Sequence, residues 1–287
     1  MTNAYAAYLA RTDEELKAFI DPAHMSYLPV YLGRADARHS LGEAPEAVLR
    51  ELWLAAQVYQ GSGGVFLTKW PHSQLRRRRL EPLEVALVAG DAAVLKSVVK
   101  TFGIEPMLLF AGIEPDEVAA EVKAVTSYFQ SERVSDALEL AGTLAIFYAT
   151  MLSALGDGDA EGFEAARRRA LRLVDDQGHL LGGIAAGGIA RIRVVHEALA
   201  ALRPARPELL AQAIVRHGAL HAIEVQKSWE KDAEAKAEGR GALDRTGLCL
   251  LVVAKSLGVE LAAALAAGGA DAATLAYAEA LGHTRAP

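Results

Sequence analysis

Along most of the chain, apolar residues return every three or four positions, with charged residues between them. Residues 44–59 give the clearest example of this helical interval. Their apolar positions are Val48, Leu49, Leu52, Ala55, Ala56 and Tyr59. The spacing predicts an amphipathic helix that turns one apolar face toward a core. Pro45 suits its first turn, where no intrahelical bond requires the N–H group that proline lacks.

Two Gly-Asp turns divide longer periodic stretches into pairs of helices. Helical periodicity covers residues 74–89, stops at Gly90 and Asp91, and returns over 92–102. The same order recurs where 138–155 and 160–174 flank residues 156–159, which are Gly-Asp-Gly-Asp. Glycine favours the left-handed conformation that ends a helix, and aspartate caps the start of the next one. We therefore expect helical hairpins, and their recurrence predicts a stack of such pairs.

Helical patterns also fill most of the remaining chain. They cover 116–130, 191–202, 208–236, 241–257, 260–267 and 271–281. Residues 61–71 contain a GSGG run and are expected to depart from helix, whereas the small residues of 182–188 either let two helices approach or break one helix in two. The sequence thus predicts an all-α fold of stacked helical hairpins, with about a dozen helices in one compact body over residues 1–287. Residues 1–72 are a candidate for a looser N-terminal subdomain.

The composition supports the same fold and excludes some functions. About a fifth of the residues are alanine and only 6% are aromatic, which closely packed helices tolerate and sheets do not favour. With 52% hydrophobic and 23% charged residues, the chain can bury a sizeable core. Its formal charge of −6, from 30 basic and 36 acidic residues, repels a polyphosphate. We therefore expect no nucleic acid partner.

Three absences in the sequence indicate the compartment. The first ten residues are followed at once by charged residues and lack the basic and apolar regions of a secretory signal. No uncharged stretch reaches the roughly 18 apolar residues that a spanning helix needs, so no membrane partner is expected. Cys249 is the single cysteine and cannot form an intramolecular disulfide. These features predict a cytoplasmic protein.

One helix face carries residues that suit a metal. His217, His221 and Glu224 follow at helical spacing within the predicted helix 208–236, and imidazole and carboxylate groups are common zinc ligands. The chain has no HExxH glutamate and no second acidic motif to complete the site, which favours a partly buried structural face. It also has no phosphate-binding glycine loop, no GxSxG elbow and no CxxC pair. We expect no metal, no cofactor and no catalytic residue, and hence no enzyme; a helical enzyme that uses these three residues is the least favoured alternative.

The four successive arginines Arg76–Arg79 form the strongest local charge. They are candidate contacts for a phosphate or an acidic partner. Four consecutive helical residues point in all directions, however, and Glu81 and Glu84 are spaced to pair with some of them. A solvated helix flank is therefore the favoured interpretation.

A second charged cluster surrounds a tryptophan near the end of the predicted helix 208–236. Trp229 is followed by Glu230, Asp232 and Glu234, with lysines between them. The cluster is either a solvated helix end or an aromatic anchor ringed by carboxylates that binds a basic partner. We take Trp229, Glu230, Asp232 and Glu234 as the predicted partner-binding residues.

Three segments, taken in order, resemble a known family. Residues 83–102 and 144–173 each contain an apolar helix, a Gly-Asp turn and a second helix, and the Trp229 segment is followed by LDRTGLCLLVVAKSLGVEL at 243–261. Over residues 80–262 this order resembles the Imm49-like immunity proteins of bacterial polymorphic toxin systems. The resemblance implies a helical, non-catalytic, cytoplasmic protein that binds a cognate protein toxin and neutralises it by occlusion. The chain departs from the family pattern at its end, where an alanine-rich helix replaces a tail rich in aromatic residues and proline.

Composition alone leaves a second function open. A helical-repeat scaffold or a regulatory binding protein without a toxin partner would share every compositional feature of this chain. It would differ only in what it binds.

Overall fold

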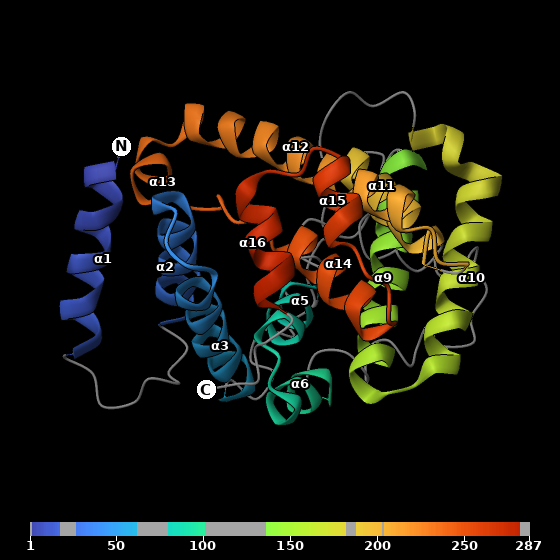
Figure 1. Ribbon diagram of the computed structural model, residues 1–287, viewed down its shortest axis with the longest axis horizontal. Helices are drawn as coiled ribbons and strands as arrows, with labels where there is room; N and C mark the ends of the chain where they lie inside the picture. The colour runs from blue at the N-terminus through green and yellow to red at the C-terminus, as the bar shows by residue number, and fades with distance from the viewer. Residues whose placement is uncertain are drawn as a thin grey trace.

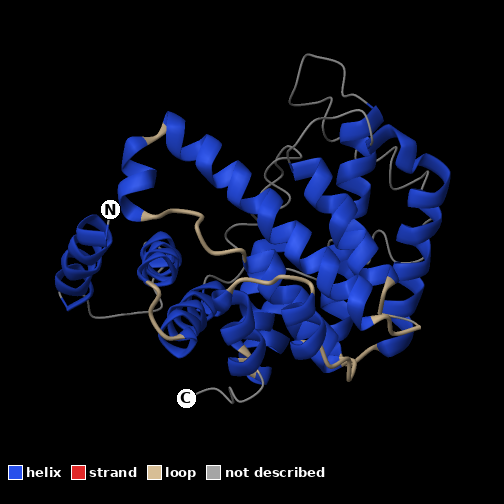
Figure 2. Cartoon of the chain, turned by 45° about the horizontal axis from the view of Figure 1, so that its top comes forward, coloured by secondary structure: helices blue, strands red, loops and turns tan. Residues whose placement is uncertain are grey.

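The computed structural model describes residues 2–17, 27–61, 80–100, 136–181, 188–202 and 204–281. Within these ranges the chain forms thirteen α-helices and one short 3₁₀ helix, and it forms no strand (Figures 1 and 2). The predicted all-α fold class is therefore confirmed.

The described helices follow one another along the chain in this order. The first are α1 (Thr2–Lys17), α2 (Leu28–Leu41), α3 (Pro45–Gly61), α5 (Glu81–Ala89), α6 (Ala92–Val98) and α9 (Asp136–Asp157). Next come α10 (Ala160–Gln177), the 3₁₀ helix η4 (Gly178–Leu181), α11 (Gly188–Ala200) and α12 (Pro207–Lys231). The last are α13 (Ala233–Glu238), α14 (Arg245–Ser256), α15 (Ala262–Ala267) and α16 (Ala272–Ala280).

The main core surrounds two short, almost wholly buried helices, α5 and α14. Every residue of α5 from Pro82 to Ala89 is buried, and α14 buries eight of its residues, Cys249 among them. The two helices contact each other near the middle of the molecule, with α9, α10 and α11 to one side (Figure 1). Helices that are apolar all round belong in such a position, because any face left in water would expose apolar surface.

The N-terminal helix packs at the edge of the molecule, on α2 (Figure 1). Tyr5, Tyr8 and Leu9 form a small cluster with Ala37 that is separate from the main core. A buried arginine of α2 also binds α1. Nη1 of Arg34 donates to the carbonyl oxygen of Leu9 at 3.2 Å. α2 and α3 themselves belong to the main core.

The predicted Gly-Asp hairpins are present. Gly90 and Gly158 both take positive φ, at 74° and 72°, which ends α5 and α9. Asp91 then caps α6 by accepting from the N–H groups of Ala93 and Val94. Asp159 caps α10 in the same way.

Two predicted helix boundaries were wrong, and an aspartate explains each. The predicted helix 208–236 is interrupted at Asp232, whose backbone is extended and whose side chain accepts from the N–H of Ala235. The predicted helix 241–257 begins only at Arg245, because Asp244 caps it through Gly247. An aspartate side chain competes with the helix for backbone N–H groups, so it starts a new helix rather than continuing the old one.

Some predictions concern residues outside the described ranges. These are Arg76–Arg79, the helix 116–130, and most of the segments 61–71 and 182–188.

Candidate functional site

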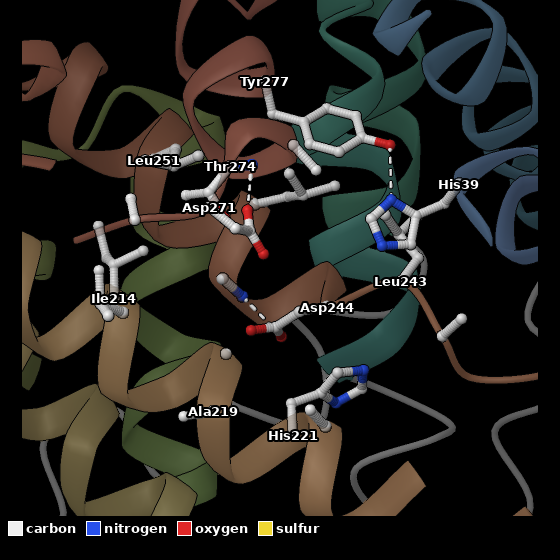
Figure 3. A pocket seen from close by; sticks show the side chains of 18 of the residues that line it. His39, Ile214, Ala219, His221, Leu243, Asp244, Leu251, Asp271, Thr274 and Tyr277 are labelled. Atoms are coloured by element: carbon white, nitrogen blue, oxygen red, sulfur yellow. Dashed lines mark hydrogen bonds between the residues drawn. The ribbon is translucent and has the colours of Figure 1, made fainter. Parts of the chain in front are cut away.

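A cavity of about 360 Å³ opens between α12, α14 and α16, with His39 of α2 at its edge (Figure 3). Most of its wall is apolar, with Ile214, Leu248 and Leu251 among the larger side chains. The polar side chains that reach it are His39, His221, Asp244, Asp271, Thr274 and Tyr277. A volume of this size, with apolar walls and a few polar groups, is typical of a binding site.

Two carboxylates face the cavity from the N-terminal ends of α14 and α16. The N–H of Gly247 donates to Oδ1 of Asp244 at 3.0 Å, and the N–H of Thr274 donates to Oδ1 of Asp271 at 2.7 Å. These N-cap bonds fix both side chains to the helices that they start. The second oxygen of Asp271 points into the cavity (Figure 3).

Asp244 also bonds to a buried histidine behind the cavity wall. Nδ1 of His217 lies 2.7 Å from Oδ2 of Asp244. Burial by itself raises the pKa of Asp244, but the His217 imidazole and the Gly247 N–H favour the carboxylate, and the net effect lowers this pKa far below its usual value. Asp244 is therefore ionised at neutral pH.

His39 and Tyr277 form a neutral pair across the cavity. Nδ1 of His39 lies 3.2 Å from the hydroxyl oxygen of Tyr277, and the ring centroids are 5.8 Å apart. Burial lowers the pKa of His39, although the charges of Asp271 and Asp244 favour its protonated form. Burial likewise raises the pKa of Tyr277. Both side chains are therefore uncharged at neutral pH.

The candidate metal ligands His217, His221 and Glu224 each have a protein partner instead. Nε2 of His221 lies 2.8 Å from the carbonyl oxygen of Gly241, so Nε2 carries the proton and Nδ1 accepts from Arg191 at 3.1 Å. Glu224 pairs with Nη2 of Arg191 at 2.5 Å. Within the described part of the chain, no three His, Cys, Asp or Glu side chains gather so as to hold a metal ion.

The segment between α13 and α14 forms part of the cavity wall and is held by three side chains. Its Gly241 and Leu243 N–H groups donate to the buried carboxylate of Asp36 at 2.8 and 3.0 Å. The Gly241 carbonyl binds His221, and the Arg240 carbonyl accepts from the indole N–H of Trp229 at 2.9 Å. Helices α2 and α12 thus fix the position of this segment.

The predicted partner-binding residues lie at the far end of α12 and in the start of α13. Trp229 is partly buried, with its indole fixed by the bond to Arg240, while Glu230, Asp232 and Glu234 are exposed. Asp232 also has the structural role of capping α13. Glu234 lies 3.5 Å from the guanidinium of Arg240. These four residues therefore lie together where α12 ends and α13 begins, and none of them lines the cavity.

Sequence reasoning missed His39, Asp271 and Tyr277 as cavity residues. Asp271 lies two residues after the pair Gly268-Gly269 and directly before an alanine-rich helix, which is an N-cap signal and predicts a local role only. His39 and Tyr277 carry no local signal, because the pair exists only once the fold brings these two side chains of α2 and α16 into contact.

Comparisons with known proteins identify no relative: no family model matches the chain, and neither a curated protein nor a solved structure is significantly similar to it. Among the described residues, no helix has both the length and the apolar character that crossing a membrane requires.

Proposed function

We propose that this protein is an immunity protein that binds a cognate protein toxin and neutralises it by occlusion. The observation that carries the proposal is the outer row of α12, a line of exposed side chains along the whole helix. The members of this row are Leu209, Gln212, Arg216, Ala219, Ile223, Gln226 and Glu230. Their spacing of three and four residues keeps them on one face of the helix.

The row carries exposed apolar surface where a soluble helix usually has polar side chains. Leu209 and Ile223 are 47% and 46% exposed, and they are the only large apolar side chains exposed among the described residues. They are separated by four turns, so about 21 Å divides them along the axis. A helix docks into a groove of a protein partner through apolar side chains that share one face, as these two do.

The distal end of α12 offers exposed carboxylates to a basic partner, interspersed with the exposed lysines Lys227, Lys231 and Lys236. The row ends at Glu230, and the exposed carboxylates of Asp232 and Glu234 continue it. A protein of net charge −6 is attracted to a basic surface, and toxins that act on nucleic acids or nucleotides commonly carry one at their active sites. Occluding such a surface requires contact area and complementary charge, and no chemistry by the immunity protein.

The experiment is to co-express the chain with the product of the adjacent gene, which the proposal takes to be the toxin, and to measure the affinity of the purified complex. We expect Ile223→Asp to weaken binding at least about tenfold, because it puts a charge at the centre of the apolar contact. The matched control is Ala10→Asp, a similar change at an exposed position of α1. Circular dichroism of each variant checks that the helices are intact.

The same experiment separates toxin neutralisation from its alternative. If the chain forms no complex with the adjacent toxin, the proposal is wrong and a scaffold or regulatory protein becomes the better reading. If a complex forms and Ile223→Asp binds as tightly as the wild type, the outer row of α12 is not the contact face.

A further inference from the structure

We propose that the cavity between α12, α14 and α16 receives an arginine side chain of the protein partner, with its guanidinium bound by Asp244 and Asp271. The inference rests on the proposed function, because it names the group that the partner contributes to the contact.

Both charged side chains in the cavity wall are carboxylates. Among the described residues that line it, these are Asp244 and Asp271, and none is a lysine or an arginine. Asp244 already bonds to His217 behind the wall, whereas Asp271 is bound by the N–H of Thr274. The two imidazoles of the wall, His39 and His221, are partly buried and uncharged at neutral pH. A helix N-terminus offsets about half a charge, so the capping carboxylate of Asp271 still leaves a net negative site. A cation is the ligand that this arrangement favours.

The shape and the apolar walls of the cavity favour a long cationic side chain over a metal ion. Its walls are aliphatic, with Ile214, Leu248 and Leu251 beyond the carboxylates, and its volume of about 360 Å³ accepts a long side chain. An arginine buries its methylene stem against apolar surface and presents several N–H donors in a plane, which suits two carboxylates on separate helices. A bare metal ion is disfavoured, because the described residues form no metal-binding cluster.

The cavity also adjoins the proposed contact face. Ala219 and Ala222 of α12 line the cavity and are exposed, and Ala219 belongs to the outer row. A partner seated on this row lies beside the opening. A side chain that enters from there would pass these two small residues and reach the carboxylates.

The site is tested first with a small probe and isolated protein. Titration with n-butylguanidinium is followed by the amide NMR signals of Gly247 and Thr274, whose N–H groups bind the two carboxylates. The variant is Asp271→Asn, because asparagine caps a helix as well as aspartate and only the charge is removed. Asp159→Asn is the matched control, since Asp159 is an exposed N-cap on α10.

We expect saturable shifts in the wild type, binding about tenfold weaker in Asp271→Asn, and no change in Asp159→Asn. Butylurea, a neutral molecule of the same shape, should not bind. Equal binding of butylurea, or unchanged binding by Asp271→Asn, would mean that charge does not select the ligand, and the inference would be wrong.

The second test uses the toxin complex. Asp271→Asn should weaken it about tenfold, while Asp159→Asn should leave it unchanged. If Ile223→Asp weakens the complex and Asp271→Asn does not, the proposed function stands and the arginine site is wrong. If neither variant weakens the complex, the proposed contact face is wrong as well.

Discussion

Buried imidazoles show how single residues couple the stability of this protein to pH. His196 of α11 is 1% exposed, and burial lowers its pKa from 6.5 to about 4, although the backbone of Leu144 favours the protonated form. Below about pH 6.5 the unfolded chain binds a proton at this residue that the folded chain does not bind until about pH 4. The free energy of unfolding therefore falls as the pH drops through this window.

We predict that His196 removes ~2 kcal/mol of stability between about pH 6.5 and pH 4.5, because the full slope of ~1.4 kcal/mol per pH unit holds only between the two pKa values and is smaller near each of them. Urea unfolding of the wild type and of His196→Gln at both pH values measures the difference. The variant should lose much less stability, since glutamine does not titrate. The pKa of Asp244 is lowered, so protonation of this residue reduces the free energy of unfolding only at lower pH. That effect is the same in both proteins. Equal losses in the two proteins would contradict the assignment.

At the scale of elements, a few side chains decide how helices join. Asp36 of α2 is 3% exposed and accepts both N–H groups that hold the segment before α14. Burial raises the pKa of Asp36, while Arg245 and the two N–H groups oppose this effect. The segment carries part of the cavity wall, so the docking of α2 helps to shape a site whose other walls lie on α12, α14 and α16.

We predict that Asp36→Ala lowers the free energy of unfolding by ~3 kcal/mol, because it leaves two N–H groups near the core without an acceptor. Asp36→Asn is the matched variant, since its amide keeps one acceptor oxygen and should cost roughly half as much. Urea unfolding at neutral pH gives both values. If both variants lower the free energy of unfolding equally and by less than ~1 kcal/mol, water replaces the carboxylate, and Trp229 and His221 alone hold the segment.

The connections between helices also show which parts of the fold could be predicted. The hairpins at Gly90-Asp91 and Gly158-Asp159 were predictable because a left-handed glycine and an N-cap aspartate act on residues within one turn. The break at Asp232 carried the same aspartate signal without a glycine. In the sequence, continuous helical periodicity favoured one unbroken helix. In the folded chain, Asp232 interrupts it and caps α13.

The cavity is lined by residues from both ends of the chain, so no local sequence pattern could reveal it. His39 and Tyr277 are 238 residues apart, and Asp36 and Leu243 are 207 apart. Residues 39 and 277 also lie outside the span 80–262 on which the proposed resemblance to Imm49-like proteins rests. The partner-binding cluster at Trp229 was predicted from local charge, whereas no local charge pattern indicated the cavity.

Net charge acts on the molecule as a whole, and it should govern how fast a basic partner arrives. Reversing Glu230 and Glu234 to lysine changes the net charge from −6 to −6 + 4 = −2. Because both side chains are exposed at the rim of the proposed contact face, we predict a several-fold slower association rate and a nearly unchanged dissociation rate. Asp175→Lys with Asp176→Lys is the matched control, since these exposed residues lie on α10, on the other side of the molecule, and give the same net charge (Figure 1).

Surface plasmon resonance at ~0.05 M and ~0.5 M salt separates the local from the global effect, because added salt screens exposed charges beyond a few ångströms. At low salt the α12 and α13 double variant should associate more slowly than the α10 double variant, and at high salt the two should converge. Equal slowing at low salt would mean that the total charge attracts the partner and that the end of α12 has no special part. Wild-type rates in both variants would contradict electrostatic steering altogether and leave apolar contact at Leu209 and Ile223 as the basis of recognition.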